Sequence, residues 1–441
     1  MSSNPNPTKH LRWLAGHTIV QNIVALSAAQ IATYMFPLIT VPYLARVLGV
    51  AGWGVVAFAQ AFGAYLTLVV EYGFSLSGTR EVARHVGNEE KLAEIMAGVQ
   101  GARVLIMVGA IVVAFAARWV VPIFRAQPDL LWAATFSALV QALSMMWYFQ
   151  GVERMKLVAS LDFMAKALAT VGIFIIVRVP TDDWKVLMLQ GLGASISLVA
   201  GFAVAYREVP FRMPTWSTTW EALHMGWSMF LFRTSVSLYT VGNAFILGLF
   251  VPPQFVGFYA GAEKISRAVL SLLNPVNRTL FPRLSRLIRE SRARAVRLAR
   301  ISLIVTGLGG AAMGIMILIF APLLVRIILG HAYAPAVPVL RVLALLPPLI
   351  ALSGILGIQW MVPLGLDKAF NSIIVIAGVV NMGLAVVLAP SMKAEGMAWA
   401  VVSAEAFVTL AMFFHLRWRR LDPISYAPVA SLQPGYSKTC E

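Results

Sequence analysis

The sequence predicts an all-α polytopic membrane protein of about 12 transmembrane helices, arranged as two six-helix lobes around a central cavity. Hydrophobic residues make up 59% of the 441 residues and charged residues only 12%, whereas a soluble domain carries about 25% charged residues. Apolar runs of about 20 residues, the length that crosses the hydrocarbon of a bilayer, recur along almost the whole chain. The sequence therefore leaves no room for a large soluble domain.

Hydropathy and helix-breaking residues divide the chain into an N-terminal six-helix lobe at 17–210 and a C-terminal six-helix lobe at 211–416. We expect residues 1–16 to form a cytoplasmic N-terminus and residues 417–441 a cytoplasmic tail. The first apolar run continues to Leu48, which is far longer than the apolar part of a signal peptide, so we expect it to stay uncleaved. The predicted spans are roughly 17–47, 53–80, 92–117, 128–150, 157–178, 185–206, 221–250, 255–284, 297–325, 335–364, 369–389 and 395–416.

Lysine and arginine are unevenly shared between alternate loops. They concentrate after the even-numbered spans, which the positive-inside rule assigns to the cytoplasm, so both termini are predicted to be cytoplasmic. The densest basic run, RLSRLIRESRARAVRLAR at 283–300, is typical of an amphipathic helix on an anionic lipid surface, and a role as a topology anchor explains it equally well. The net charge of +16 does not indicate nucleic-acid binding, because the cations lie between apolar spans rather than on a soluble face.

The two halves of the chain resemble each other weakly. A shift of 203 residues aligns WGVVAFAQ (53–60) with VGFYAGAE (256–263), so that Gly54 falls on Gly257. Both halves also begin with two unusually long spans. The shared register indicates a six-plus-six repeat, an architecture that places a substrate path between two lobes that rock against each other.

No metal, nucleotide or other cofactor is predicted. The single cysteine, Cys440, lies in the polar tail, which excludes a disulfide framework and a thiolate metal site. The 6 histidines are scattered near the ends of spans. A G-x-x-x-x-G-K-[ST] motif is absent from the sequence, so we expect no ATP-binding loop.

Ionisable residues inside the predicted spans are the candidates for function, because such groups usually face a polar cavity or pair with one another. Asp162 and Lys166 are four residues apart on one helix, as are Glu263 and Arg267, so structural and functional roles are equally favoured for these pairs. The full set consists of Arg103, Lys166, Arg233, Lys264, Arg267, Arg341, Glu71, Asp162, Glu263 and Glu405.

A polar stripe follows one face of the eighth span. Successive members are three or four residues apart, which places them on one side of a helix. A lipid-facing helix is not built in this way, so the stripe is predicted to line water or a polar ligand, and the cationic lining comes chiefly from the C-terminal half. The stripe consists of Lys264, Arg267, Ser271, Asn274 and Arg278.

Arg233 lies in the middle of the stretch FLFRTSVSLY at 230–239, which is otherwise apolar or small. A cation in the middle of a span raises the free energy of membrane insertion by about 2.5–3.5 kcal/mol on insertion scales. A compensating role is therefore expected for Arg233. Unpaired arginine and lysine in a hydrated cavity attract anions, and a guanidinium matches phosphate oxygens in two-pronged geometry. We expect Arg233 to bind an anionic cargo. The alternative is that Arg233 pairs with Glu71 or Glu405 and locks the helices together.

Several stretches carry a resemblance to a known family. They are PLITVPYLARVLGVAGWGVVAFAQ (37–60), EYGFSLSGTREVAR (71–84), VGFYAGAEKISRAVLSLLNPVNRTLFPRLSRL (256–287), VPLGLDKAFN (362–371) and AEGMAWAVVSAEAF (394–407). Together they resemble the bacterial oligosaccharide flippases, the Wzx-like O-antigen and exopolysaccharide translocases of the multidrug/oligosaccharidyl-lipid/polysaccharide exporter superfamily. The resemblance covers nearly the whole chain.

This resemblance implies a cargo of undecaprenyl-diphosphate-linked oligosaccharide, flipped from the cytoplasmic to the outer leaflet of the bacterial inner membrane for surface polysaccharide assembly. Expected partners are this lipid-linked oligosaccharide, anionic membrane lipids, and a polysaccharide polymerase or export machinery; nucleic acid is not expected. The predicted diphosphate-binding or anion-binding residues are Arg233, Lys264, Arg267, Asn274, Arg278, Arg46, Arg80 and Arg103. Glu71 and Glu405 have no cation at helical spacing, and they are the candidates for ion coupling.

Three other classes of membrane protein fit the sequence less well. A multidrug exporter of the same superfamily would favour an acid-lined cavity, and the spans hold more cations than acids. A major facilitator carries G-x-x-x-D-R-x-G-R-R after its second span, whereas this loop reads GTREVARHVGNEE. A polymerase or lipid-linked glycosyltransferase would need a large or acidic outer loop, which the short predicted outer loops do not provide. We therefore expect no enzymatic activity.

Overall fold

The computed structural model describes residues 36 and 39–424, without the side chains of some residues in α10 and α13, and every element in this part of the chain is helical. A helical stretch at 39–47 leads into the N-terminal half. Its elements are α2 (Gly49–Glu71), α3 (Phe74–Arg84), α4 (Glu89–Val120), α5 (Pro122–Ala126), α6 (Pro128–Ala142), α7 (Met146–Gly151), α8 (Met155–Ile176), η1 (Pro180–Asp182) and α9 (Asp183–Glu208).

The C-terminal half begins with a long helix and ends with a folded pair. Its elements are α10 (Trp216–Thr240), α11 (Asn243–Gly248), α12 (Pro253–Leu270), η2 (Ser271–Leu273), α13 (Asn274–Glu290), α14 (Arg292–Ile328), η3 (His331–Tyr333), α15 (Ala336–Leu343), α16 (Leu346–Gly354), η4 (Ile355–Met361) and α17 (Asp367–Trp418). The predicted first span (17–47) and cytoplasmic ends lie largely outside the described residues.

Within the described residues, 8 helical segments are long and apolar enough to cross a membrane. One of them, α17, is a hairpin: its backbone leaves the helical region at Lys393, where φ is 53°, and a Cβ at Gly396 would overlap the carbonyl oxygen of Leu388. The arms on either side of this reversal correspond to the predicted spans 369–389 and 395–416. The all-helical polytopic fold predicted from the sequence is confirmed.

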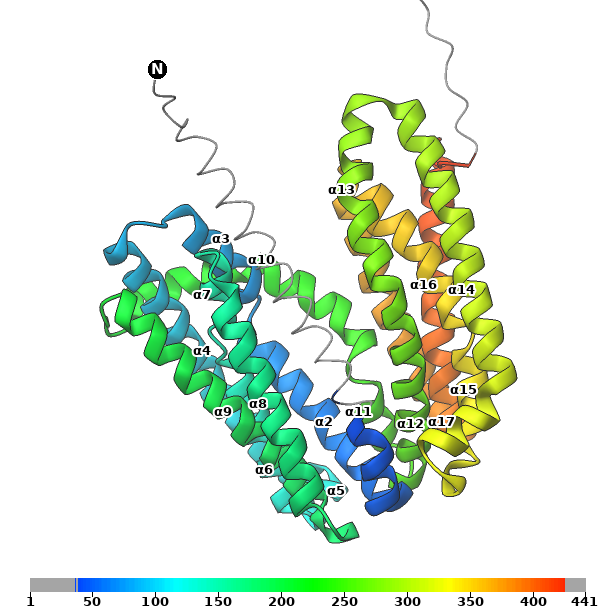
Figure 1. Ribbon diagram of the computed structural model, residues 1–441, viewed down its shortest axis with the longest axis horizontal. Coiled ribbons are helices and arrows are strands. Elements are labelled where there is room, and N and C mark those ends of the chain that lie inside the picture. The colour runs from blue at the N-terminus through cyan, green and yellow to red at the C-terminus, as the bar shows by residue number, and fades with distance from the viewer. Residues whose placement is uncertain (1–35, 37–38, 425–441) are drawn as a thin grey trace, which may run out of the picture.

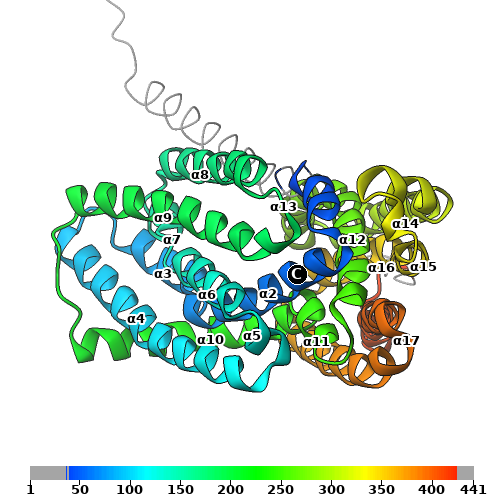
Figure 2. The same cartoon turned by 90° about the horizontal axis from the view of Figure 1, so that it is seen from below.

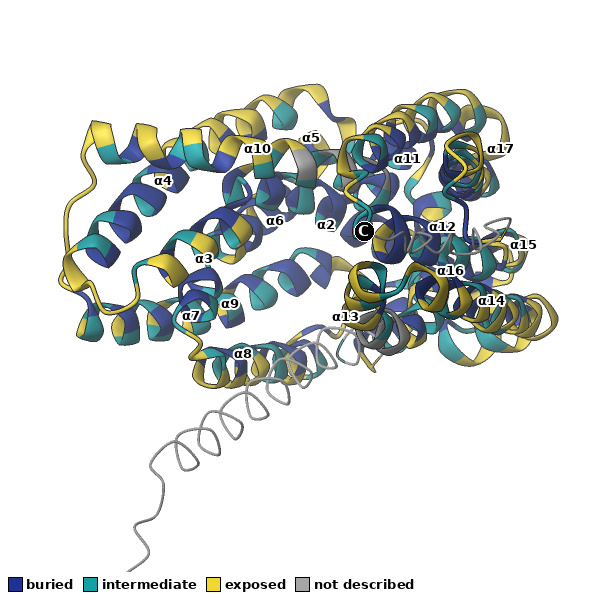
Figure 3. Cartoon of the chain, turned by 90° about the horizontal axis from the view of Figure 1, so that it is seen from above, coloured by how far each residue is buried: buried dark blue, intermediate teal, exposed yellow. Residues whose placement is uncertain are grey.

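The helices form two lobes, seen side by side in Figures 1 and 2, with α2 to α9 in one and α12 to α17 in the other. In Figure 1 the lobes meet at the lower end and diverge toward the end that carries α13 and the start of α14. The outward faces of α4 and α14 are exposed in Figure 3 and carry large apolar side chains, such as Val112 at 63% exposure and Ile304 at 61%. Apolar surface of this extent is suited to contact with lipid.

The contact between α2 and α12 is built on two glycines that allow the backbones to touch. A Cβ at Gly54 would overlap the carbonyl oxygen of Pro253, and a Cβ at Gly257 would overlap that of Val50. Both glycines, and both carbonyls, are separated by the 203-residue offset that relates the two halves in sequence. The contact is therefore reciprocal, and equivalent positions of the two halves make it.

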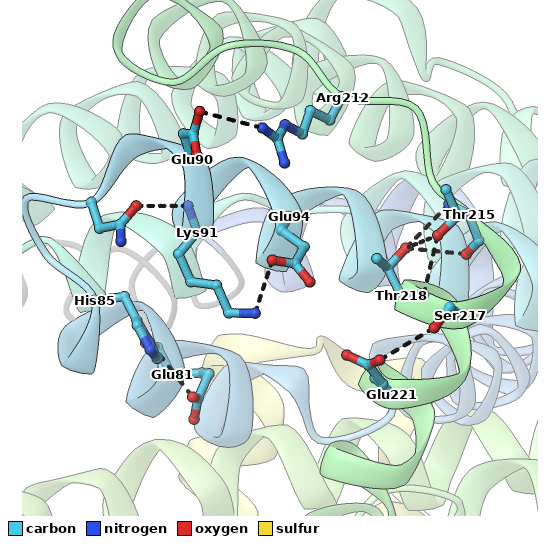
Figure 4. A network of polar contacts seen from close by, with 11 residues as sticks. Glu81, His85, Glu90, Lys91, Glu94, Arg212, Thr215, Ser217, Thr218 and Glu221 are labelled. Carbon is cyan, nitrogen blue, oxygen red and sulfur yellow. Dashed lines mark hydrogen bonds and ion pairs between the residues drawn. The ribbon is translucent and has the colours of Figure 1, made fainter.

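Helix α10 belongs to both lobes, because it packs against α4 of the N-terminal lobe as well as α17. Small residues let it approach α4: a Cβ at Gly98 would lie 2.6 Å from the carbonyl oxygen of Thr218. A polar network anchors its first turns (Figure 4), in which Thr215 caps the helix and Arg212 lies 3.8 Å from Glu90. The predicted lobe boundary at residue 211 thus precedes a helix that bridges the lobes.

We expect Gly54→Ala and Gly257→Ala to destabilise the protein to a similar degree, by about 1–3 kcal/mol, because the added methyl group forces two packed backbones apart. The thermal unfolding midpoint of the purified protein measures the effect. Gly109→Ala in α4 is the matched control, since a Cβ there meets no atom within 4 Å. An unfolding midpoint for Gly54→Ala equal to that of the control would contradict the close crossing.

Candidate functional site

A cavity of about 580 Å³ lies among α2, α6, α8 and α9, and Lys264 of α12 reaches its wall from the other lobe. We call it the interlobe cavity. Its volume falls within the range of about 300–1,000 Å³ that is typical of small-molecule sites. Its polar lining consists of Thr40, Gln60, Thr67, Ser137, Gln141, Ser144, Asp162, Lys166, Thr170, Gln190, Ser197 and Lys264.

Each wall of the interlobe cavity is one face of a helix. On α2, the lining residues Trp53, Gln60, Ala64 and Thr67 follow at spacings of seven, four and three residues, which keeps them on one side. Gly63, at the edge of this lining face, also packs closely against α6: a Cβ there would lie 3.2 Å from the carbonyl oxygen of Ala134. The packing thus turns the polar face of α2 toward the cavity.

The polar lining is mostly amide and hydroxyl groups. The Nε2 group of Gln60 donates to Oε1 of Gln190 across 3.3 Å, which joins α2 to α9. The Nε2 group of Gln141 donates to the hydroxyl of Ser137 at 2.9 Å. Thr67 donates its hydroxyl to backbone carbonyls of α2 and α6. These bonds hold the side chains in place and leave further donors and acceptors for a ligand.

Three charged residues line the interlobe cavity, and two of them neutralise each other. Lys166 and Asp162 on α8 form the predicted pair, with Nζ 2.7 Å from Oδ2. Lys264 is partly buried, and no carboxylate oxygen of the described residues lies within 4 Å of its ammonium group. Lys264 therefore gives this cavity a net positive charge.

Arg233 does not present a free guanidinium to the interlobe cavity. Its Nη1 lies 2.7 Å from Oε1 of Glu71 and also donates to the hydroxyl of Ser75. The contact occurs where α2 ends, with Tyr72 at φ 48° and stacked on Phe230 at 4.7 Å between ring centroids. The alternative interpretation, in which Arg233 pairs with Glu71 and locks helices, describes this structure.

Arg267 is also engaged. Its guanidinium lies 2.8 Å from Glu263, as the four-residue spacing predicts, and donates to the carbonyl oxygen of Thr240 at the end of α10. Arg267 is exposed and is not part of the cavity lining. The predicted stripe therefore contributes Lys264 to the cavity and uses Arg267 to hold α10 against α12. The side chains of Asn274 and Arg278 lie outside the described residues.

Arg103 is a structural residue in this conformation. It is only 1% exposed, donates from Nη1 to the carbonyl oxygen of Ser144 at 3.0 Å, and lies over the rings of Phe74 and Trp147. A guanidinium between two aromatic faces is stabilised by cation–π attraction. Because Arg103 is enclosed behind Ser144, the structure does not bring it to the interlobe cavity.

Arg46 and Arg80 lie apart from the interlobe cavity. Arg46 donates from Nη2 to the carbonyl oxygen of Ile327 at 2.7 Å, at the C-terminal end of α14, where a cation complements the helix dipole. Arg46 thereby links the first helical stretch to the C-terminal lobe. Arg80 is exposed on α3.

The two predicted coupling acids have different surroundings. Glu71 is paired with Arg233 of α10. The absence of a cation at helical spacing on its own helix therefore did not mean that Glu71 lacks a partner. Glu405 on α17 is 8% exposed and accepts a hydrogen bond of 2.6 Å from Ser353 on α16. Among the described residues no cationic side chain lies within 4 Å of its carboxylate.

Comparison with known proteins identifies the family of this chain. Residues 19–288 match the family described as polysaccharide biosynthesis protein. The chain belongs to this family. A candidate O-antigen transporter of Escherichia coli (strain K12) is 30% identical over 406 residues, covering 91% of this chain and 97% of that protein. A protein of the same name from Shigella dysenteriae is 29% identical over 401 residues, covering 89% and 98%.

Solved structures show the same fold at low sequence identity. The lipid II flippase MurJ in an inward closed conformation matches with a TM-score of 0.71 at 12% identity, covering 90% of this chain and 87% of that one. An inward-facing multidrug resistance MATE transporter of the MOP superfamily matches with 0.64 at 15% identity, covering 92% and 100%. The predicted resemblance to this superfamily and its two-lobed architecture is confirmed. The relatives and neighbours are transporters and flippases rather than enzymes.

The sequence alone did not identify most of the polar residues that line the interlobe cavity. The charged residues predict a cationic lining chiefly in the C-terminal half, whereas most of the polar lining consists of amides and hydroxyls, chiefly of α2, α6 and α9. A signal was present in the spacing of Gln60, Ala64 and Thr67, which forms one face of the second span.

The Arg233–Glu71 pair predicts non-additive mutations. Arg233→Gln and Glu71→Gln should each destabilise the protein, and the double variant should lose little more than either single variant, with a coupling energy of about 0.5–3 kcal/mol. Thermal unfolding of the purified variants measures this coupling. Arg341→Gln is the control, because Arg341 is exposed and has no ion pair within the described residues. Fully additive losses would show that the pair does not stabilise the fold.

Proposed function

We propose that this protein flips undecaprenyl-diphosphate-linked oligosaccharide repeat units across the bacterial inner membrane during surface polysaccharide assembly. The observation that supports it most is the interlobe cavity, whose wall combines amides and hydroxyls with the cation of Lys264. A lipid-linked oligosaccharide offers the matching chemistry, because its head combines sugar hydroxyls with a diphosphate. The O-antigen transporter named among the relatives and the fold shared with a lipid II flippase support the same class of cargo.

The physical task of such a flippase is to shield a polar head from hydrocarbon. Transfer of an unpartnered hydroxyl group from water to an apolar medium costs about 2–7 kcal/mol of free energy, and transfer of a charged phosphate costs far more. The interlobe cavity supplies hydrogen-bonding groups in place of water, and at an effective dielectric constant of about 20 a charge pair 4 Å apart is worth about 4 kcal/mol. Lys264 is the residue we assign to the diphosphate. The polyprenyl tail needs no cavity, because it can stay in the lipid.

The proposed cycle follows from the two-lobed shape. The lobes diverge toward the end that carries the basic run 283–300, and Arg80 is exposed on α3 (Figure 1). We assign this end to the cytoplasm, where anionic lipids and the newly made glycolipid would meet these cations. Rocking of the lobes about the α2–α12 crossing would then close this end and open the other. A polysaccharide polymerase or export machinery would receive the flipped unit.

A multidrug exporter of the same superfamily fits the interlobe cavity less well. Organic cations are held by unpaired carboxylates or aromatic faces. The acid among the lining residues, Asp162, is neutralised by Lys166 at 2.7 Å. With Lys264 added, the described lining repels a cationic drug.

Lys264→Ala should abolish transport while normal amounts of protein reach the membrane, and Lys264→Arg should partly restore it, because the proposed role needs a cation in the interlobe cavity. The measurement is surface polysaccharide in cells that lack the native gene, together with the glycolipid that accumulates on the inner leaflet. Lys156→Ala is the control, since Lys156 is exposed outside the cavity. Full surface polysaccharide in Lys264→Ala cells would remove Lys264 from the site.

We propose Glu405 as the residue that carries a coupling proton, because it is buried and the one described hydrogen-bond partner of its carboxylate is neutral. Transport by Glu405→Gln should lose its dependence on external pH, since the amide cannot gain or lose a proton in this range. Uptake of labelled glycolipid into vesicles at several imposed pH gradients tests this. A Glu405→Gln variant with the pH dependence of the unmodified protein would end the assignment.

A further inference from the structure

We infer that the wall of the interlobe cavity formed by α2, α6 and α9 is a sugar-recognition subsite, in which Gln60, Gln141 and Gln190 read the hydroxyl groups next to the diphosphate. This inference rests on the proposed function and deepens it. The cavity then has two parts with different roles. Lys264 binds the diphosphate of any such lipid, and the uncharged wall distinguishes one glycan from another.

The first argument is the hydrogen-bonding capacity of the amides. A glutamine offers two N–H donors and an oxygen with two lone pairs, and a sugar hydroxyl both donates and accepts. Gln60 and Gln190 share one hydrogen bond of 3.3 Å, and Gln141 makes one of 2.9 Å to Ser137. Most of the capacity of these side chains is thus available. Their mutual bonds fix their orientation, which is what a selective site requires.

The second argument is an unsatisfied donor in the same wall. Trp53 lines the interlobe cavity, is 2% exposed, and its indole nitrogen has no hydrogen-bond partner among the described residues. A buried donor without a partner is uncommon in folded proteins and costs stability. The nitrogen is itself shielded from solvent, so a sugar or phosphate oxygen in the cavity would satisfy it only once the indole turns toward the cavity.

The third argument is size. About 580 Å³ is room for part of a glycan rather than for a long oligosaccharide. Because Lys264 and the three amides line one cavity, a diphosphate held by Lys264 places the sugars that follow it against the amides. The distal sugars of a repeat unit would extend beyond the lining residues, so the subsite reads the end of the glycan that is attached to the lipid.

Binding of two lipids to the purified protein in lipid nanodiscs tests the inference. The probes are bare undecaprenyl diphosphate and the lipid-linked oligosaccharide extracted from cells in which the gene has been deleted. We expect the unmodified protein to bind the glycosylated lipid at least tenfold more tightly. Gln60→Leu and Gln190→Leu should each lose about tenfold in affinity for the glycosylated lipid and keep their affinity for the bare lipid within about twofold, because only sugar contacts are removed.

Further variants separate recognition from folding. Gln190→Met keeps the length of the side chain and removes its amide group without adding a charge, so it should lose the same preference. Trp53→Phe should weaken binding of the glycosylated lipid while keeping an aromatic ring in the wall. Gln100→Leu is the matched control, because Gln100 is a partly buried glutamine of α4 outside the cavity lining and bonds to Met145. It should keep the full preference.

The outcomes distinguish this inference from the proposed function. Equal affinity of the unmodified protein for both lipids, or equal weakening of both by Gln190→Leu, would overturn the sugar subsite and leave the diphosphate cargo standing. Failure of the unmodified protein to bind either lipid would overturn the proposed cargo, and the subsite with it.

Discussion

The close crossing of α2 and α12 is the contact on which the remaining structure depends. Gly54 and Gly257 allow two helix backbones to touch, and any larger side chain at either position would overlap a carbonyl oxygen of the partner helix. The crossing holds the lobes together at one end and lets them diverge at the other (Figure 1). Beyond the crossing, α2 and α12 carry the residues Gln60 and Lys264 to the wall of the interlobe cavity. The position of the cavity is thus a consequence of backbone packing.

Several charged residues hold helices together, Asp162 and Lys166 neutralise each other at the cavity wall, and Lys264 leaves the cavity a net charge. Arg233 with Glu71, Arg267 with the carbonyl oxygen of Thr240, and Arg46 with the end of α14 join separate helices, whereas Arg267 and Glu263 pair within α12. These contacts give the charged side chains polar partners that the surrounding hydrocarbon cannot provide. Since α10 takes part in two of these contacts and packs on both lobes, its bonds must rearrange if the lobes rock. Lys264 stands apart because its ammonium group faces the cavity lining without a described carboxylate partner.

Sequence reasoning succeeded where the signal is local. Apolar run length predicts most of the spans found in the described residues, the reversal at Lys393 falls between two predicted spans, and the 203-residue register recurs in the Gly54–Gly257 contact. The predicted spans 221–250 and 255–284 are instead divided, because α10 ends at Thr240 before α11 and α12 ends at Leu270 before α13. The pairs Asp162–Lys166 and Glu263–Arg267 were visible from four-residue spacing. The role of Arg233 could not be derived in this way, because Glu71 lies 162 residues away in sequence. The burial of Arg103 and the amide wall likewise depend on how separate helices pack, which hydropathy does not encode.

The central claim is that the head of the cargo enters the interlobe cavity, and covalent capture of that head tests it most directly. A photoreactive amino acid at Ala194, which lines the cavity on α9, should crosslink to radiolabelled lipid-linked oligosaccharide in membranes on irradiation. The same amino acid at Leu192, two residues away on the exposed face of α9, should capture ordinary phospholipid and little of the glycan-bearing lipid. Strong capture at Ala194 with little at Leu192 is the predicted result. Equal capture at both positions, or capture at Leu192 alone, would contradict the claim that the glycan crosses the membrane between the lobes.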